Sequence, residues 1–444
     1  MLDYYKELLN INKLPTFLNK YLKCKSLIRL KKVGYFCGMD YASSDIYDFT
    51  EYISRYDHSI TVALLVYKLT KDKLATLRGL FHDVGTPVFS HVIDYMDEDY
   101  EMQESTEKYT EKVILNDKYL IDCLKKDKIN PIDVINFKDS NIVDNKRPKL
   151  CADRLDGVIL TGIGWTKNIT KVDIKNIIDS ITIYKNEDNE NEIGFTNLNV
   201  AEKVVEISKS IDEICHSIED NYMMDLLANI TKKIIDKEYI TYDSLYSLDE
   251  DEIIDIINKI DDKEIKSLFN KFLNIKLKDI EVISLPSVKE RRLNPLVNGK
   301  RIWGIMKDKK ELIRKIKFTL FSISAGIIEI IIFTLLEKFT NFSYWACYLP
   351  ALVASVIWNF TLNREYTFKS TVNIPKAMSL VFLFYLIFTP VSTIIGNYLA
   401  ENLGWNDFIV TGLNMLANFI LEYLWDEFVV FRNTIDTKEK HERS

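Results

Sequence analysis

Hydrophobic and polar positions follow two different patterns along this 444-residue chain. Up to about residue 300 the chain is charged, and its apolar residues recur with the spacing typical of helices. The apolar run from Ile60 to Leu69 predicts a buried helix, and a second run ends at Phe81. Residues 317–431 instead hold four long apolar stretches. We therefore expect a soluble part and a membrane part in one chain.

Weaker patterns predict the remaining elements of the soluble part. Helices are expected in 105–143, with a break near Asn130-Pro131, and again across 199–275. Within the second region, the run that starts at Leu248 and continues Asp-Glu-Asp-Glu is typical of a capped helix start. The polar run 185–192 lies beside Ile- and Val-rich segments and predicts a surface loop or hairpin tip.

The end of the soluble part is basic. Residues 281–286 predict a strand, and the following segment up to Arg301 carries several lysines and arginines. This segment is either a positively charged rim beside a membrane or a phosphate or effector site. Taken together, the patterns predict a mostly all-α helical bundle with minor β elements over residues 1–305 and a four-helix transmembrane domain over 306–444.

Four segments are long enough to cross a bilayer, since about 20 apolar residues span about 30 Å of hydrocarbon. They are 317–336, 344–362, 377–399 and 408–424. Basic residues precede the first span, lie between the second and third, and follow the fourth, whereas the other two connections are poor in them. The positive-inside rule then places both termini and the soluble part in the cytosol. Glu329, inside the first span, is a functional candidate unless a hydrogen-bond partner makes it structural.

Charge and cysteine usage narrow the class of protein. The formal net charge is −7, so there is no global case for nucleic-acid binding. The six cysteines are scattered without a CxxC pair, which indicates a reducing compartment rather than a disulfide framework. The N-terminus carries no signal-peptide pattern, and the heavy use of Ile, Lys and Asn is typical of an AT-rich bacterial genome.

Three of the five histidines lie in the stretch 55–91. His58, the doublet His82-Asp83 and the later Asp153 are suitable ligands for a divalent metal ion. Each histidine alone is more simply explained as a core histidine with a hydrogen bond. The whole set favours a metal site, because a buried aspartate beside a buried histidine is costly unless it is paired or bound to metal.

These motifs resemble the HD superfamily of metal-dependent phosphohydrolases, and within it the deoxynucleoside triphosphate triphosphohydrolases. The resemblance rests on Arg55-Tyr-Asp-His58-Ser, on Leu80-Phe-His82-Asp83-Val-Gly-Thr-Pro-Val-Phe-Ser-His91, and on Ala152-Asp153-Arg154-Leu-Asp156. It covers roughly residues 20–300, strongly at the motifs and loosely elsewhere.

The resemblance implies a role for each candidate site residue. His58, His82, Asp83 and Asp153 would hold a divalent ion such as Mn, Mg, Fe, Co or Zn.

Arg55 and Arg154 would bind substrate phosphate, for which a guanidinium is well shaped. His91, oriented by Asp94, would assist proton transfer, with Glu104 in the catalytic neighbourhood.

The chain departs from the triphosphohydrolase pattern at three positions. Thr86 stands where that family usually has a histidine, and Gln103, before Glu104, replaces the histidine of a His-Glu pair. Glutamine cannot act as an acid, so the metal ligands are complete while part of the acid–base set is missing. Gly157 stands where related enzymes carry an aromatic residue against the substrate sugar. Asp156 is expected to be a supporting carboxylate.

The membrane part contains an internal repeat. Asn359-Phe-Thr-Leu-Asn363-Arg364 closes the second span, and Asn418-Phe-Ile-Leu-Glu-Tyr closes the fourth, so the Asn-Arg pair aligns with Glu422-Tyr423. The region resembles the GtrA-like family, which is tied to cell-surface polysaccharide synthesis and to polyprenyl-phosphate-linked sugars. Asn359, Asn363 and Arg364 are its candidate residues; Arg364 either meets a lipid phosphate or is an ordinary interfacial anchor.

Two functions remain open. In the first, a membrane-anchored, metal-dependent phosphohydrolase acts on a nucleotide or another phosphate ester and is coupled to a GtrA-like unit that moves a polyprenyl-linked sugar. In the second, a GtrA-like carrier or accessory is controlled by a degenerate HD domain that senses a nucleotide without hydrolysing it. Both imply a bacterial cytoplasmic membrane protein, and a homo-oligomer is possible.

Overall fold

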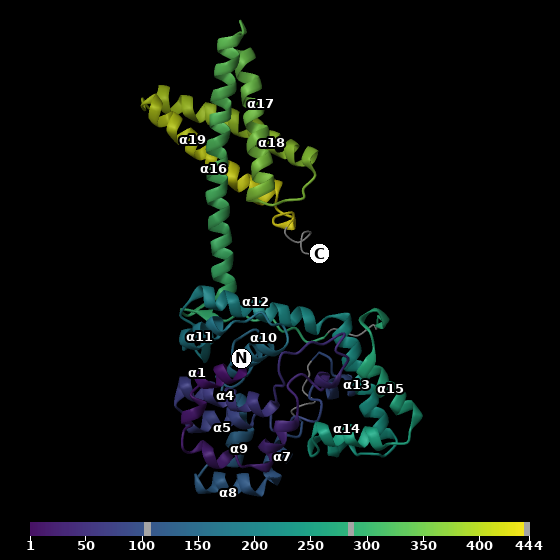
Figure 1. The fold of residues 1–444 in the computed structure, drawn as a ribbon. Helices are drawn as coiled ribbons and strands as arrows, with labels where there is room; N and C mark the ends of the chain where they lie inside the picture. The colour runs from purple at the N-terminus through teal and green to yellow at the C-terminus, as the bar shows by residue number, and fades with distance from the viewer. Residues whose placement is uncertain (102–107, 283–287, 439–444) are drawn as a thin grey trace. The chain divides into compact units, whose positions relative to one another are not determined.

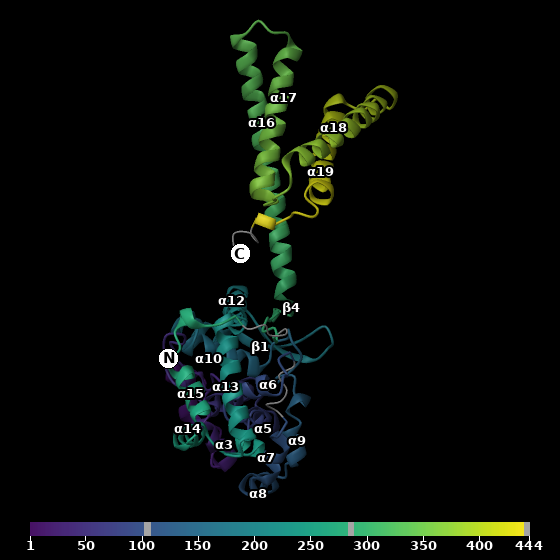
Figure 2. The same ribbon diagram turned by 90° about the vertical axis from the view of Figure 1, so that its right-hand side faces the viewer.

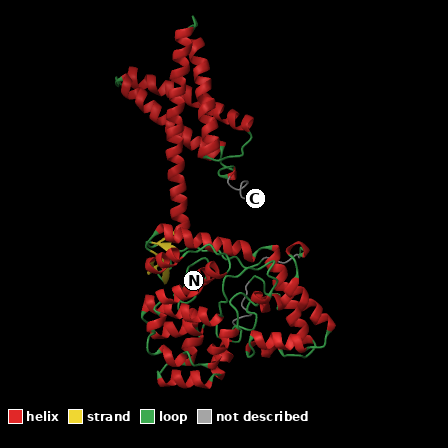
Figure 3. Cartoon of the chain, viewed as in Figure 1, coloured by secondary structure: helices red, strands yellow, loops and turns green. Residues whose placement is uncertain are grey.

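The computed structural model describes residues 1–101, 108–282 and 288–438 and divides into two compact units, residues 1–304 and 305–444 (Figure 1). Helices make up most of the described chain, with one small sheet in the first unit (Figure 3). The prediction of a mostly all-α chain with minor β elements and apolar helices near its C-terminus is confirmed.

The first unit consists mainly of short and medium helices. They are α1 (Leu2–Leu8), α2 (Leu18–Tyr21), α3 (Lys25–Arg29), α4 (Arg55–Thr70), α5 (Lys73–Phe81), α6 (Val92–Met96), α7 (Thr110–Asn116), α8 (Lys118–Lys126), α9 (Pro131–Ile135), α10 (Ala152–Gly164), α11 (Lys171–Ser180), α12 (Leu198–Cys215), α13 (Ile218–Asp236), α14 (Glu250–Lys259) and α15 (Lys263–Asn274). The break expected at Asn130-Pro131 is the start of α9, where Asn130 caps the helix and Pro131 is its first residue.

A small sheet closes this unit. Its strands are β1 (Ile181–Lys185), β2 (Asn191–Phe195), β3 (Leu296–Val297) and β4 (Lys300–Arg301), in that order across the sheet. β1 and β2 pair antiparallel, which confirms the hairpin predicted around 185–192. The strand predicted over 281–286 lies mostly outside the described residues, and the strands β3 and β4 occur further along the chain.

Capping and close packing set the position of α4 and α5. Ser54 and Asp57 form a capping box at the start of α4, and Asp72 accepts a backbone hydrogen bond at the start of α5. A side chain at Gly79 would lie within 3.4 Å of Val62 and Val66, so glycine lets α5 pack closely on α4. The same capping logic confirms the predicted helix start after Leu248, where α14 begins with a capping box at Asp249.

The described part of the second unit contains four long helices, α16 (Ile302–Phe339), whose first three residues belong to the first unit, α17 (Tyr344–Leu362), α18 (Ile374–Asn397) and α19 (Asp407–Trp425). α16 pairs with α17, and α18 with α19 (Figure 2). Within the described residues, Ile302–Phe339, Ala346–Thr367 and Ile374–Asn402 are long and apolar enough to cross a membrane. The fourth predicted span, 408–424, falls on α19.

The two halves of this unit follow one plan with an offset of 63 residues. α17 and α19 begin at Tyr344 and Asp407, and each is followed directly by a π-helical turn, η8 (Asn363–Thr367) or η10 (Asp426–Val430). Phe368 and Phe431, which follow these turns, stack on each other with ring centroids 4.6 Å apart.

This plan corrects the register of the internal repeat. The sequence comparison aligned Asn359 with Asn418, because both precede a phenylalanine. The structure instead makes Glu422 the counterpart of Asn359 and Asp426 the counterpart of Asn363. The sequence alignment was therefore wrong by four residues, about one helical turn.

Candidate metal centre and cavity

The two histidines of the predicted metal site come from adjacent helices. His58 lies in the first turn of α4, and His82 is the residue at which α5 ends. The Nδ1 atom of His82 contacts the carbonyl oxygen of Gly79 at 2.8 Å, which fixes the ring with Nε2 free to face His58. Because α4 and α5 pack closely, the two rings meet with Nε2 atoms 3.2 Å apart.

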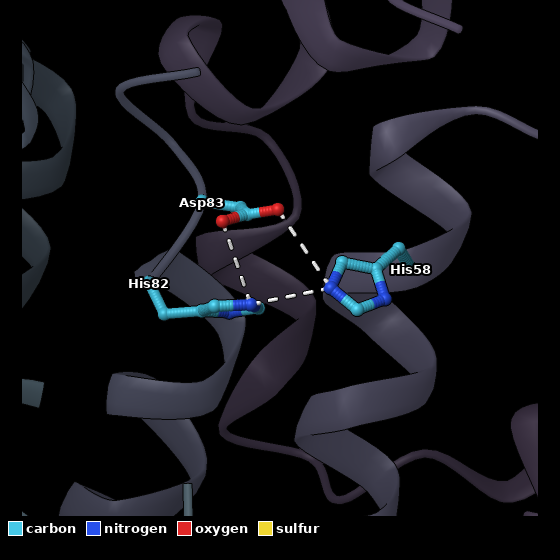
Figure 4. Close-up of side chains that lie close together, drawn as sticks. All are labelled: His58, His82 and Asp83. Atoms are coloured by element: carbon cyan, nitrogen blue, oxygen red, sulfur yellow. Dashed lines mark hydrogen bonds and ion pairs between the residues drawn. The ribbon is translucent and has the colours of Figure 1, made fainter. Parts of the chain in front are cut away.

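Asp83 follows in a tight turn that aims its carboxylate at the same point. The amide of Thr86 donates to the carbonyl oxygen of Asp83 at 2.9 Å and closes the turn. Gly85 is required there, since a Cβ atom would lie 2.6 Å from the backbone of Thr110. The carboxylate oxygens of Asp83 lie 3.7 Å from His58 Nε2 and 3.6 Å from His82 Nε2 (Figure 4).

Helix α10 contributes two carboxylates with different positions. Asp153, in its first turn, places Oδ1 at 3.1 Å from His58 Nε2 and 3.6 Å from His82 Nε2. Asp156, one turn on, lies behind His58 and accepts from its Nδ1 at 2.7 Å. The hydroxyl of Tyr5 donates to the other oxygen of Asp156 at 2.5 Å. Asp156 thus holds the His58 ring with Nε2 directed at the cluster.

The four side chains of the cluster change one another's pKa values. Burial alone would lower the pKa of His82, but the carboxylates of Asp83 and Asp153 outweigh it and raise that pKa to about 10. His58 shows the same balance, and its pKa is also raised. Against the cost of burial, the imidazoles hold the pKa of Asp153 well below its usual range. The cluster therefore favours positive charge at its centre.

The donor set fits a divalent metal ion. His58, His82 and Asp83 present ligand atoms that all lie within 4.8 Å of one another, and Asp153 joins them. Two imidazole nitrogens and two carboxylates form a hard-to-borderline ligand set, which suits Mn, Mg, Fe, Co or Zn.

A second group, Asp144, Cys151 and Asp153, is less suitable. Asp144 Oδ1 already pairs with Arg154 at 3.4 Å, and burial raises the pKa of the Cys151 thiol to about 12.

Arg55 lies between the cluster and the adjoining cavity. It is buried, its guanidinium donates to Asp83 Oδ2 at 2.9 Å, and its Nε atom donates to the hydroxyl of Ser90 at 3.1 Å. The guanidinium also lies over the ring of Tyr35, 4.9 Å from its centroid. These contacts give Arg55 a fixed position beside the metal ligands.

His91 and Asp94 form the pair that was expected from their spacing. The Nδ1 atom of His91 lies 2.8 Å from Oδ2 of the fully buried Asp94, at the start of α6. Burial lowers the pKa of His91, and Asp94 opposes this only in part. A neutral imidazole that donates from Nδ1 to Asp94 leaves Nε2 as a base.

A cavity of about 980 Å³ adjoins the cluster, lined by Arg55, Asp83, His91 and Asp153 among others. Arg147, Arg154 and Arg291 also line it. The pKa of Arg147 is lowered to about 10, first by burial and then by the guanidinium groups of Arg291 and Arg154. Within the described part of the chain, Arg147 forms no hydrogen bond or ion pair. Three neighbouring guanidinium groups are suited to an anion of several charges.

Sequence reasoning missed Arg147 and did not single out Arg291. Arg147 belongs to no motif, and Arg291 lies far along the chain, in the basic segment that was assigned either to a membrane rim or to a phosphate site. Lys289 and Arg291 of this segment line the cavity. Arg301 does not; it pairs with Glu187 at 2.8 Å and Glu192 at 2.6 Å.

The other predicted residues of the soluble unit have different surroundings. Arg154 lines the cavity, but its Nε atom donates to the carbonyl oxygen of Lys149 at 3.1 Å and another nitrogen binds Asn145. Thr86 is buried and does not line this cavity. Gln103 and Glu104 lie outside the described residues.

Gly157 also lines the cavity. A Cβ atom there would lie 2.8 Å from the hydroxyl of Tyr35, so Tyr35 occupies the space of an aromatic side chain at 157.

The candidate residues of the membrane unit differ in whether their side chains form hydrogen bonds or ion pairs. Asn363 donates to Asn359 Oδ1 at 2.8 Å, so these two belong to one hydrogen-bonded chain. Arg364 lies 3.8 Å from Glu365. Within the residues that the structure describes, Glu329 has no hydrogen bond or ion pair, so the structural partner considered for it is not found there.

Comparison with known proteins agrees with both units. A family described as "HD domain" matches residues 55–134, and one described as "GtrA/DPMS, transmembrane domain" matches residues 317–431. The chain therefore carries an HD domain, of the metal-dependent phosphohydrolase superfamily, fused to a GtrA/DPMS transmembrane domain, and it is a membrane protein.

A curated relative is the uncharacterized protein YdhJ of Bacillus subtilis (strain 168). It is 34% identical over 106 residues, which are 23% of this chain. The match spans about a third (32%) of the length of YdhJ.

Proposed function

We propose that this protein is a membrane-anchored, metal-dependent phosphohydrolase that acts on a soluble phosphate compound, with a nucleotide as the favoured substrate. The single observation that carries the proposal is the convergence of His58, His82, Asp83 and Asp153 at the edge of a cavity lined by arginines. A purely structural cluster would not need an anion-binding cavity beside it.

The residues divide the work as follows. His58, His82, Asp83 and Asp153 would hold a divalent ion, which when bound polarises a phosphoryl oxygen and activates water.

Arg55, fixed by Asp83 and Ser90, would bind the oxygens of the reacting phosphate. His91, kept neutral and oriented by Asp94, would accept or return a proton through Nε2. Arg147 and Arg291 would bind further phosphates away from the reacting one.

Two features favour a nucleotide over a small monophosphate. The cavity, at about 980 Å³, is large enough for a nucleotide, and Tyr35, Tyr95 and Trp165 contribute aromatic rings to its lining. The guanidinium groups of Arg147, Arg154 and Arg291 suit a chain of phosphates rather than one. Triphosphohydrolase activity on a deoxynucleoside triphosphate is the particular reaction that the motif resemblance supports.

The membrane unit determines where in the cell the enzyme is located. We propose a bacterial cytoplasmic membrane protein with both termini and the HD domain in the cytosol, because basic residues concentrate on alternate connections. In this proposal the GtrA-like unit handles a polyprenyl-phosphate-linked sugar during polysaccharide synthesis, and the fusion places both activities in one pathway.

The test is a product assay on the full chain in detergent or nanodiscs, with Mn, Mg, Fe or Co and a panel of nucleotides. Release of triphosphate, pyrophosphate and phosphate is measured separately. The double variant His82→Ala, Asp83→Ala should lose bound metal and turnover, whereas Asp122→Ala, at an exposed position of α8, should keep both.

Equal activity in the double variant and the wild type would refute the proposal. Tight nucleotide binding with no product over hours would favour the alternative, a carrier or accessory whose HD domain is a nucleotide sensor.

A further inference from the structure

The interior of the membrane unit contains a chain of polar side chains that the HD chemistry does not use. Thr367 donates to Asn363 Oδ1 at 2.8 Å, and Asn363 donates to Asn359 Oδ1 at 2.8 Å. Asn359 then donates to Glu422 Oε1 at 3.1 Å, which crosses from the first half of the unit to the second. Asn363 is fully buried, so this chain lies inside the protein.

The chain ends at two acidic residues. Glu422 lies in the last turn of α19, and Asp426 is four residues further on, at the start of η10. Residues at this spacing share a helix face. Asp426 is only 5% exposed, and within the described residues its carboxylate has no hydrogen bond or ion pair. An ionisable group buried without a partner in a membrane domain is costly, which makes it a candidate for function.

Among the described residues, no basic side chain pairs with either carboxylate. The ionisable groups that interact with Asp426 are Glu422 and Tyr385, and Tyr385 on α18 also forms a hydrogen bond with Glu422. Arg314, on α16, pairs instead with Glu427 at 3.3 Å and Asp436 at 3.1 Å. Two neighbouring carboxylates without a counter-charge, of which Asp426 is buried and Glu422 partly buried, disfavour each other's ionisation and favour an added cation.

We infer that Glu422 and Asp426, with Asn359 holding Glu422 in place through its amide N–H, form a binding site for a small monovalent cation, either a proton or Na⁺. Both sources supply the positive charge that the carboxylates lack, and carboxylate oxygen atoms suit either. The acidic site would repel a lipid phosphate, so it is distinct from a headgroup site at Arg364. It is independent of the proposed HD reaction.

The repeat supports a specialised role for this pair. Glu422 and Asp426 take the positions that Asn359 and Asn363 hold in the first half. At these positions the first half is thus neutral and the second half is acidic, and the counterparts Asn359 and Glu422 contact each other there. A merely structural hydrogen-bond network would be satisfied by neutral amides in both halves.

The experiment uses the purified full chain in lipid nanodiscs, with two arms. Infrared difference spectra over a pH titration without Na⁺ detect a buried protonated carboxyl group. Binding of radioactive ²²Na⁺ at high pH detects a sodium site. The variant Glu422→Gln, Asp426→Asn is compared with Glu337→Gln, which changes an exposed carboxylate of α16.

We expect the wild type and Glu337→Gln to show a protonated carboxyl signal in addition to that of Glu250, saturable ²²Na⁺ binding, or both in competition, and the double variant to lose these while it keeps the signal of Glu250. A proton signal without ²²Na⁺ binding identifies the proton, and saturable ²²Na⁺ binding identifies sodium. If the double variant does not fold, Asn359→Ala should still move the loss of the carboxyl signal to higher pH, because the amide donor that it removes favours the ionised form of Glu422. A wild type that shows neither signal, or a signal unchanged in the folded variants, overturns the inference.

Discussion

Asp156 gives a quantitative test of the metal centre because it contacts the cluster only through His58. Both side chains are buried, with exposed fractions of 1% for His58 and 0% for Asp156. In Asp156→Asn the shape is kept, and the amide must turn its oxygen toward His58 Nδ1–H and its NH₂ group toward the Tyr5 hydroxyl oxygen. A charge-assisted hydrogen bond at 2.7 Å then becomes a neutral one.

The magnitude follows from that exchange. A hydrogen bond to a charged group contributes about 1.5–3 kcal/mol and a neutral one about 0.5–1.5, so the loss is about 1–1.5 kcal/mol, or roughly tenfold in metal affinity. This agrees with the losses of about ten- to a hundredfold that follow when a residue supporting a metal ligand is changed.

The assay is calorimetric titration of metal-stripped full chain with Mn²⁺, with metal content checked by mass spectrometry. Asp57→Asn is the matched control, because Asp57 lies on the same helix and belongs to its capping box rather than to the cluster. It should lower thermal stability and leave Mn²⁺ affinity unchanged. Affinity within about threefold of wild type in folded Asp156→Asn would refute the claim that Asp156 orients His58.

Three further predictions concern the cavity, a buried acid and a turn. Arg147→Ala should raise KM about tenfold or more for a polyphosphate substrate, with a smaller change in kcat, in steady-state kinetics. Burial raises the pKa of Glu250 to about 8, so the folded state keeps a proton that the unfolded chain releases above about pH 4. The free energy of unfolding should therefore fall by at most about 5 kcal/mol as pH rises from 4 to 8. Measurements of Tm against pH should show this fall in the wild type and a smaller one in Glu250→Gln. Gly85→Ala should cost about 1–3 kcal/mol of unfolding free energy and reduce bound metal, because its Cβ would meet Thr110.

The metal ligands could be predicted from the sequence because they belong to short local motifs. His82 and Asp83 are adjacent, and the break after them is marked by Gly85 and Pro87. Their convergence with Asp153 came from a resemblance, since nothing in the spacing brings α10 to α4. The helix of the second span was also predictable, at 344–362, because a long apolar run permits no other element in a membrane.

The cavity arginines and the repeat register could not be found in the same way. Arg147 and Arg291 are 144 positions apart and interact only through the tertiary fold. The repeat was aligned on the identical Asn-Phe pairs at 359 and 418, whereas the structure aligns helix ends and π-helical turns. An identical dipeptide is weak evidence for the alignment of two repeats, because the packing of whole helices sets their register.

The 63-residue repeat means that the membrane unit is built like a dimer whose two subunits are one polypeptide. In a homodimer, every acidic side chain near the symmetry axis would occur twice and face its own copy. Covalent linkage removes that restriction: Arg364 has Glu427 as its counterpart, and Asn359 has Glu422. Each half can therefore carry its own charge. A variant that exchanges Asn359 and Glu422 keeps the same set of side chains and changes only the half that carries the acid, so it shows whether a property of the membrane unit depends on the presence of the acid or on the half in which it lies.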